Sequence, residues 1–216
     1  MTARVVEDDE AGRNEAIAVL RTGGVVGLPT DTVYGIAVDP DLPGALELLY
    51  AAKQRPPDRR IAVLCADVAQ AAGLGEMTPP AEALAAAFWP GGLTLVLRVR
   101  PGSVPAAFGT EIETLGIRVP AHACPRAIAR ALGPLPTTSA NLSGQPEATD
   151  AEAIVAILGQ AVGLVIDGGP SSGGLASTVV DCSGSRVRIL RSGAIPADEI
   201  VDCLRRAGLS VAVALG

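Results

Sequence analysis

The chain has 216 residues, of which 49% are apolar but only 2% aromatic, and its formal net charge is -6. A chain of this length buries about 70% of its unfolded surface, so an aliphatic core suffices for folding. The acidic balance opposes a broad basic face for nucleic acid, and no apolar run reaches the length of a membrane span. We therefore expect a cytoplasmic protein without membrane contact.

The four cysteines, Cys65, Cys124, Cys182 and Cys203, are widely spaced. Because no Cys-x-x-Cys pair or Cys/His cluster occurs, the sequence predicts neither a zinc site nor a disulfide framework. Residues 1–10 are acidic and lack the apolar core of a signal peptide. We expect no metal site and no bound prosthetic group.

Helices and strands are predicted in irregular alternation along the chain. Apolar residues at helical spacing predict helices at 11–21, 42–53, 66–73, 80–88, 124–132, 151–158 and 197–207. Short apolar runs predict strands at 25–28, in a second run through Val38, and at 61–65, 93–99, 116–120, 163–166, 178–180 and 187–190, with a loop at 101–110. This order favours an α/β fold with an open mixed sheet flanked by helices, and not a barrel.

Residues 23–35 are the stretch around which the chain is organised. Its buried strand stops at Pro29, because proline cannot donate a hydrogen bond to a sheet. Thr30, Asp31 and Thr32 follow, and short polar side chains at the end of a buried strand suit a small-molecule site in an apolar cleft. A polar turn between two strands is the alternative, since threonine and aspartate also favour turns.

Further polar side chains fall where predicted strands end, and many of them are cationic or carry a hydroxyl. Ligands bind outside the strand ends of open sheets, so the set predicts a site that holds an anion by charge-assisted hydrogen bonds. The set consists of Thr30, Thr32, Lys53, Arg55, Arg118, Ser139, Asn141, Ser177 and Arg191.

Lys53 is the only lysine, although lysine and arginine together number 17. Lys53 and Arg55 lie two apart before a diproline, and a point charge beside a planar fork resembles a phosphate clamp. A solvated helix end is the alternative. Neither a GxxxxGK[ST] phosphate loop nor a GxSxG nucleophile elbow is present, and the only histidine, His122, is expected at the surface where a helix begins. No catalytic residue is assigned.

Several segments together carry a resemblance that none of them would support alone. In this order and at these spacings they are similar to the motifs of YrdC-type L-threonylcarbamoyladenylate synthases, from Ala16 to Gly193. The segments are Pro29-Thr30-Asp31-Thr32-Val33-Tyr34-Gly35, Lys53-Gln54-Arg55-Pro56, Phe88-Trp89-Pro90-Gly91, Arg118-Val119-Pro120, Ser139-Ala140-Asn141, Ser177-Thr178 and Ile189-Leu190-Arg191-Ser192-Gly193.

The resemblance implies a YrdC-like fold, in which an open twisted mixed sheet flanked by helices has a deep central cleft. It also implies a nucleotidyltransferase that converts L-threonine, bicarbonate and ATP to threonylcarbamoyl-AMP and pyrophosphate. That product would serve the synthesis of N6-threonylcarbamoyladenosine in tRNA (t6A37). ATP would be a substrate with Mg as its counter-ion. The product would pass to a tRNA threonylcarbamoyltransferase, and any tRNA contact would be weak.

The resemblance also implies two groups of binding residues. Arg118, which stands alone in a short apolar strand, would pair with the carboxylate of threonine, and Thr32, Ser139 and Ser177 would complete that pocket. ATP would be bound by Lys53, Arg55, Arg59, Thr114, Asn141, Thr149 and Arg191. The chain departs from many relatives at Asp31, often Glu, at Leu64, where some carry His, and at Arg59, which replaces a smaller polar residue.

One synthase domain is expected at 11–193, followed by a short helical extension at 194–216, as in the short, single-domain form of the family. A sister enzyme that makes carbamoyl-adenylate is a first alternative, which the missing Cys-x-x-Cys pairs oppose. An RNA-binding module that holds tRNA or double-stranded RNA is a second, opposed by the acidic balance and the few aromatics. An inactive paralogue is a third, opposed by the complete Lys53/Arg55 and Ser139/Asn141 pairs.

Overall fold

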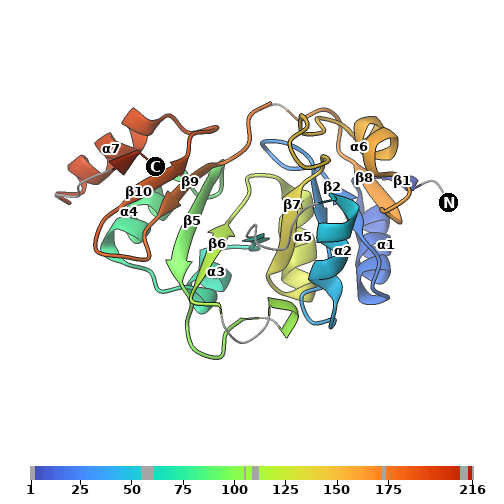
Figure 1. Cartoon of the computed structure of the whole chain (residues 1–216), viewed down its shortest axis with the longest axis horizontal. Coiled ribbons are helices and arrows are strands. Elements are labelled where there is room, and N and C mark those ends of the chain that lie inside the picture. The colour runs from blue at the N-terminus through green and yellow to red at the C-terminus, as the bar shows by residue number, and fades with distance from the viewer. Residues whose placement is uncertain are drawn as a thin grey trace.

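Strands from the whole chain pair into one sheet in the computed structural model, which describes residues 3–54, 61–104, 106–108, 112–171, 174–209 and 214–215. Within these residues the strand order is β1-β8-β2-β3-β7-β4-β6-β5-β9-β10-β11 (Figure 1). Parallel pairs such as β4 with β6 occur beside antiparallel pairs such as β3 with β7, so the open mixed sheet is confirmed. In chain order the strands are Arg4–Glu7, Val26–Leu28, Gly35–Ala37, Ala62–Leu64, Leu93–Arg98, Thr114–Arg118, Leu135–Ser139, Leu164–Asp167, Thr178–Asp181, Arg188–Arg191 and Ala214–Leu215.

Helices flank this sheet, and each predicted helix is found within a few residues of its expected bounds. Figure 1 shows α1, α2, α5 and α6 around one half of the sheet and α3, α4 and α7 around the other half. No helix among the described residues has the length and apolar character needed to cross a membrane. The helices are Glu10–Arg21, Ala45–Ala52, Val68–Leu74, Pro79–Phe88, Ala123–Leu132, Ala151–Leu158 and Ala197–Arg206, and a 3-10 turn at Ala106–Phe108 lies in the segment predicted as a loop.

Side-chain caps fix the start of several helices. Asp9, Asp67 and Asp150 each accept a hydrogen bond from a backbone N–H in the first turn of the helix that follows. Thr78 does the same for α4, which then begins with proline. These caps satisfy backbone donors that have no partner within the helix, which is why the helices start directly after short polar residues.

Three strands were not predicted. β11 pairs in parallel with β10 at one edge of the sheet, within residues 194–216, which were expected to be helical. β1 lies at one edge of the sheet, next to β8, and its short sequence has only two apolar residues. β7 lies in the middle, between β3 and β4, and carries Pro136 and two threonines. Proline argues against a central strand because it lacks an N–H donor. Here the Pro136 carbonyl still accepts from the Val38 N–H (3.3 Å), so the strand keeps a bond to its neighbour.

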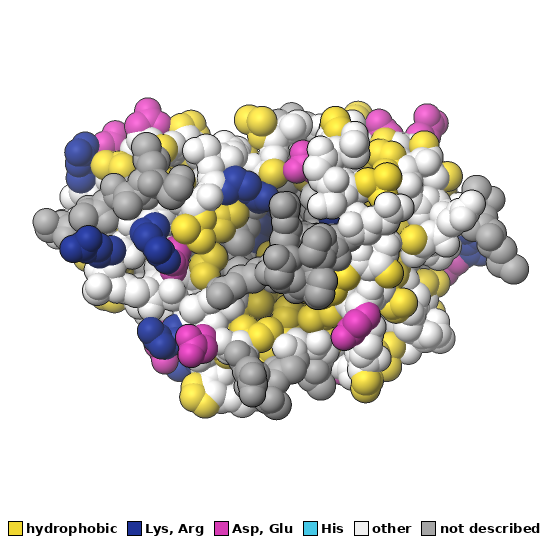
Figure 2. Space-filling model, in the orientation of Figure 1, with side chains coloured by type: hydrophobic (Ala, Val, Ile, Leu, Met, Phe, Trp, Pro, Cys, Tyr) yellow, Lys and Arg dark blue, Asp and Glu magenta, His cyan; other side chains and the backbone are white. Residues whose placement is uncertain are grey.

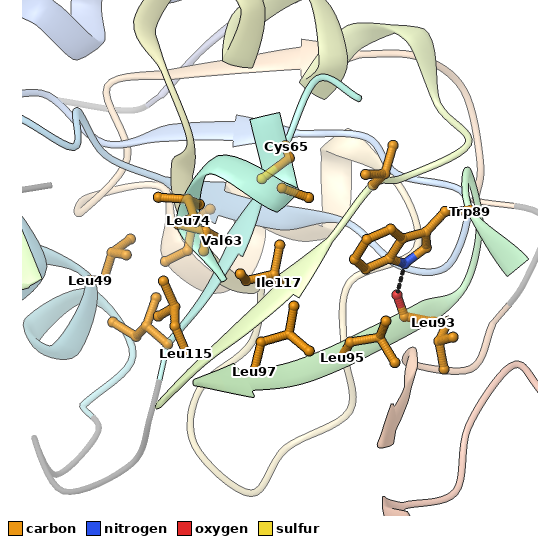
Figure 3. Close-up of a cluster of buried hydrophobic side chains, with 14 of the residues drawn as sticks. Leu49, Val63, Cys65, Leu74, Trp89, Leu93, Leu95, Leu97, Leu115 and Ile117 are labelled. Atoms are coloured by element: carbon orange, nitrogen blue, oxygen red, sulfur yellow. Dashed lines mark hydrogen bonds between the residues drawn. The ribbon is translucent and has the colours of Figure 1, made fainter. Parts of the chain in front are cut away.

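The core is aliphatic, as the composition predicts. On one face of β4, β5 and β6, Val63, Leu95, Leu97 and Ile117 are fully buried against α3 and its end (Figure 3). The single tryptophan, Trp89, closes this cluster by donating from its ring N–H to the Leu93 carbonyl (2.7 Å). Side chains alternate along a strand, so the residues between these point to the opposite face of the same strands. That opposite face carries the candidate site.

Candidate active site

A cavity of about 280 Å³ crosses the middle of the sheet on the face opposite the α3 cluster. It is lined by alternating residues of the central strands, including Thr94 and Val96 on β5 and Gly116 on β6. Figure 2 shows Lys and Arg side chains beside exposed hydrophobic ones in the middle of the face that it draws. The cavity brings together five of the predicted substrate contacts, namely Thr32, Arg118, Ser139, Ser177 and Arg191.

Arg118, at the end of β6, is buried and already bonded. Its Nε donates to the Gly91 carbonyl (2.9 Å), its Nη1 to Thr32 Oγ1 (2.8 Å) and its Nη2 to Asp31 Oδ1 (2.7 Å). Asp31 also accepts from the Ala121 N–H (3.0 Å). Arg118 is the only charged residue of β6, as the sequence shows, and its ion-pair partner Asp31 comes from a segment far away in the chain.

Burial and two charged neighbours shift the pKa of Arg118. Burial lowers the pKa of its guanidinium, the Asp31 carboxylate raises that pKa, and the nearby Arg191 lowers it. An arginine keeps its charge under such shifts. Two guanidinium groups therefore line the cavity near each other, whereas the carboxylate beside the first lines the neighbouring hollow, which leaves positive charge in the cavity for an anionic ligand.

Lys53 lies one residue after α2 and points into the protein, with only 3% of its surface exposed. Its ammonium donates to the carbonyl oxygen of Ser139, to Ser139 Oγ (3.1 Å) and to Asn141 Oδ1 (2.6 Å). The alternative of a solvated helix end is thus wrong. The lysine instead joins the end of α2 to the polar segment that follows β7.

Ser177 and Arg191 meet at the other side of the cavity. Arg191 donates from Nε and Nη2 to the Ser177 carbonyl (3.0 and 2.8 Å) and from Nη2 to Ser177 Oγ (3.0 Å). Thr94 Oγ1 lies 2.8 Å from Ser177 Oγ. Sequence reasoning missed Thr94, which is a single hydroxyl inside an otherwise apolar strand, and such an interruption is the signal that marks a residue facing a polar cavity.

The remaining predicted contacts are not gathered at the cavity. Thr114 begins β6 and Arg118 ends it, so the two side chains share a face but stand about 13 Å apart along the strand. Thr149 is exposed and does not line the cavity. Arg55 and Arg59 lie outside the described residues.

His122 is found where the sequence placed it, at the start of a helix. It caps α5, and its Nδ1 accepts from the Cys124 N–H (3.2 Å). With Thr30 and Asp31 it lines a smaller hollow of about 150 Å³, whereas it is not part of the large cavity. Among the described residues, no three His, Cys, Asp or Glu side chains group in a way that could hold a metal ion.

The protein is thus a mixed α/β sheet with a cavity over its central strands, and the cations and hydroxyls that line this cavity are groups suited to a small anionic molecule. The chain belongs to the Sua5/YciO/YrdC family, since the family model described as "Telomere recombination" matches residues 18–193. The twisted α/β architecture found here is that of solved members of this family.

Three relatives illustrate the match. A threonylcarbamoyl-AMP synthase of Bacillus subtilis is 38% identical over 188 residues, which are 86% of this chain and 54% of that protein. The crystal structure of Sua5 from P. abyssi complexed with L-threonine superposes with a TM-score of 0.86 at 30% identity, covering 98% of this chain and 62% of that one. The crystal structure of E. coli YciO gives a TM-score of 0.77 at 27% identity, covering 89% and 94%. The chain thus spans about half of the first relative and nearly all of the third.

Proposed function

We propose that this protein is an L-threonylcarbamoyladenylate synthase, which forms threonylcarbamoyl-AMP and pyrophosphate from L-threonine, bicarbonate and ATP. The observation that carries the proposal is the cavity in which Arg118, Thr32, Ser139, Ser177 and Arg191 converge. Relatives named for the same reaction, and a relative crystallised with L-threonine, support it.

Threonine would bind through its carboxylate to Arg118. A guanidinium has five N–H donors, and Gly91, Thr32 and Asp31 engage three of them. Two donors remain among the described contacts, enough for a carboxylate. Because the pocket side of Arg118 is buried, such a charge-assisted bond would be stronger than one at the surface.

The chemistry would proceed in two steps. The amine of threonine attacks bicarbonate, a C–N bond forms, and water leaves, giving an N-carboxylate anion. One oxygen of that anion then attacks the α-phosphorus of ATP, the bond to the β-phosphate oxygen breaks, and pyrophosphate leaves. An anion must approach a polyanion here, so the protein contributes mostly positioning and positive charge. Arg118 and Arg191 would supply that charge at the cavity.

ATP would enter as its Mg complex and would be bound by Lys53, Asn141 and Arg191, with Arg55, Arg59, Thr114 and Thr149 as further contacts. Lys53 donates to two oxygens of Ser139 and one of Asn141. An ammonium has three N–H donors, so a phosphate oxygen would have to replace one of these acceptors. ATP binding is therefore coupled to the segment after β7.

The reaction product is a mixed anhydride, which is a reactive acyl donor. An enzyme that transfers the threonylcarbamoyl group should therefore consume it. We assign its consumption to a tRNA threonylcarbamoyltransferase, with weak direct contact between this protein and tRNA, in the cytoplasm. The synthase domain would comprise residues 11–193, and residues 194–216 would form a short C-terminal extension that contains α7 and the strand β11.

Pyrophosphate release tests the proposal. The complete mixture should release pyrophosphate from ATP, and omission of L-threonine or of bicarbonate should abolish the release. Pyrophosphate release at the same rate with and without threonine would contradict the proposal. Salt-sensitive tRNA binding that ignores threonine would favour the RNA-binding alternative instead.

A further inference from the structure

Thr30 lines the cavity, is 5% exposed, and makes hydrogen bonds that fix where its proton points. Its Oγ1 donates to the Val33 carbonyl (2.6 Å). The same oxygen accepts from the Thr32 N–H (3.1 Å) and lies 3.0 Å from Thr32 Oγ1. A hydroxyl has one proton and two lone pairs, and a carbonyl cannot donate. Thr30 therefore gives its proton to Val33, and Thr32 must be the donor in the hydroxyl pair.

This order fixes what Thr32 offers to a ligand. Its proton goes to Thr30, and one of its lone pairs accepts from Arg118 Nη1 (2.8 Å). One lone pair remains. Thr32 lines the cavity, so its Oγ1 can offer a ligand one hydrogen-bond acceptor but has no proton left to donate.

Ser139 is fixed in the same way by different partners. The Asn141 amide donates from Nδ2 to the carbonyls of Leu142 and Gln145, so Asn141 Oδ1 is an acceptor, and Ser139 Oγ donates to it (2.7 Å). Lys53 Nζ occupies one lone pair of Ser139 Oγ. A second hydroxyl of the cavity therefore also presents only an acceptor. The pair formed by Thr94 and Ser177 differs, because either hydroxyl can donate.

We infer that Thr30 is a positioning residue for substrate recognition: it holds Thr32 Oγ1 as an acceptor, and this acceptor binds the α-amino group of the amino-acid substrate. The amine and the carboxylate of an α-amino acid are attached to the same carbon. A carboxylate on Arg118 therefore places the amine near the hydroxyl that is 2.8 Å from the same guanidinium. An acceptor at that point favours an N–H donor and disfavours a second oxygen with lone pairs.

The inference rests on the proposed function. Binding calorimetry with three ligands distinguishes failure of the inference from failure of the proposed function. L-threonine, L-2-aminobutyrate, which lacks only the side-chain hydroxyl, and ATP are each titrated into the parent, Thr30→Val and Thr30→Ser. Valine keeps the shape of threonine but removes the hydroxyl, so the Thr32 proton is released and can turn to the cavity. We expect Thr30→Val to weaken both amino acids by the same factor of about tenfold, equivalent to about 1.4 kcal/mol. ATP affinity should stay within about twofold, and Thr30→Ser, which keeps the hydroxyl, should match the parent.

Other results would overturn the inference. Loss of L-threonine affinity alone would place the substrate hydroxyl, not the amine, on Thr32. Equal losses for threonine and ATP would make Thr30 a structural residue. If Thr30→Val does not fold, as shown by absent ATP binding and a lost thermal transition, Thr30→Cys decides by the same comparison, because a thiol is a weak donor and acceptor. A parent that binds ATP but no L-threonine would overturn the proposed function itself.

Discussion

Arg118 is paired with a carboxylate of the protein before any substrate arrives, and this determines how the residue can act. Its partner Asp31 is held in turn by the Ala121 N–H, so the guanidinium cannot swing away from the cavity. A substrate carboxylate would share Arg118 with Asp31 instead of displacing it. The site therefore requires both the charge and the fixed orientation of the Arg118 guanidinium.

Arg118→Lys tests that requirement. Lysine keeps the charge but lacks the planar fork that reaches Gly91, Thr32 and Asp31 together. We expect the KM for threonine to rise by about tenfold or more, a loss of at least about 1.4 kcal/mol, with the KM for ATP changed by less than about threefold. Steady-state pyrophosphate release measures both constants.

The matched control is Arg126→Lys on α5, where Arg126 Nε donates to the Ala66 carbonyl (2.9 Å) away from the cavity. This variant should keep both parental constants. Parental threonine kinetics in Arg118→Lys would remove Arg118 from the threonine site.

Lys53→Arg tests whether the single lysine serves by charge or by shape. The compact ammonium sits among the oxygens of Ser139 and Asn141, and a guanidinium is too wide for that position. We expect a loss of stability of about 2 kcal/mol, from overpacking and misplaced hydrogen bonds, which lowers the melting temperature by about 4–8 °C in a protein of this size. Threonine-dependent pyrophosphate release should fall with it.

Thermal unfolding and activity are measured in parallel for Lys53→Arg and for Lys53→Met, which keeps the length of the side chain but not the charge. Methionine should also abolish activity, because the segment after β7 loses its cation. If Lys53→Arg melts and turns over like the parent, the lysine has no special role.

At the scale of elements, the strands β3 and β7 bring Thr32 and Ser139 to the same cavity. The pairing places Gly35 opposite Ser139, and the two strands approach closely there. A Cβ on Gly35 would lie 2.9 Å from Thr137 Cγ2 and 3.2 Å from the Thr138 carbonyl. Only glycine fits at this position. The close pairing of β3 with β7 that it allows keeps the segment with Thr32 next to the segment with Ser139.

Gly35→Ala should therefore destabilise the protein, by about 1–3 kcal/mol, because the strands must separate to admit a methyl group. Gly73→Ala is the matched control, since Gly73 is exposed in α3 and no atom lies within 4 Å of its added Cβ. Alanine favours a helix over glycine by about 1 kcal/mol, so this variant should be as stable as the parent or more so. Chemical denaturation of both variants measures the difference, and equal stability would show that β3 and β7 tolerate the methyl group.

The sequence predicted correctly those helices and strands whose formation depends on neighbouring residues alone. The helix at 151–158 was found with its bounds because Asp150 caps it and its apolar residues recur at helical spacing. β7 could not be predicted, because its polar and proline residues become a strand only through pairing with β3 and β4. The same holds for the site. The sequence predicted that hydroxyl and cationic side chains line the site. It could not predict the ion pair of Arg118 with Asp31 or the burial of Lys53, because both depend on contacts between segments far apart in sequence.

The whole molecule combines an acidic balance with positive groups at and beside its cavity. The net charge is -6, yet Arg118 and Arg191 line the cavity, and Lys53 is buried against Ser139 next to it. A low-dielectric cleft lined by one sign of charge concentrates the field on a small anion, while the acidic exterior discourages long polyanions. This division suits a nucleotide and an amino acid better than an RNA duplex.

The four cysteines should be inert in the folded protein. All four are buried and free, and burial raises the pKa of Cys65 and Cys182 to about 12 and that of Cys124 as well. At pH 8 a thiol with such a pKa has a thiolate fraction about a thousandfold below that of an ordinary cysteine. A thiol-reactive dye should label the native protein slowly and all four sites after denaturation. Rapid labelling of the native state would contradict this packing.

The central claim is that threonine, bicarbonate and ATP are joined in the cavity around Arg118. Incubation with carbon-13 bicarbonate, L-threonine and ATP, followed by mass spectrometry, tests it most directly. We predict a nucleotide product whose mass equals AMP joined to N-carboxylated threonine with loss of water, which carries the carbon-13 label and is absent without threonine. Formation of AMP and pyrophosphate without any labelled adduct, or of a labelled adduct lacking threonine, would contradict the account.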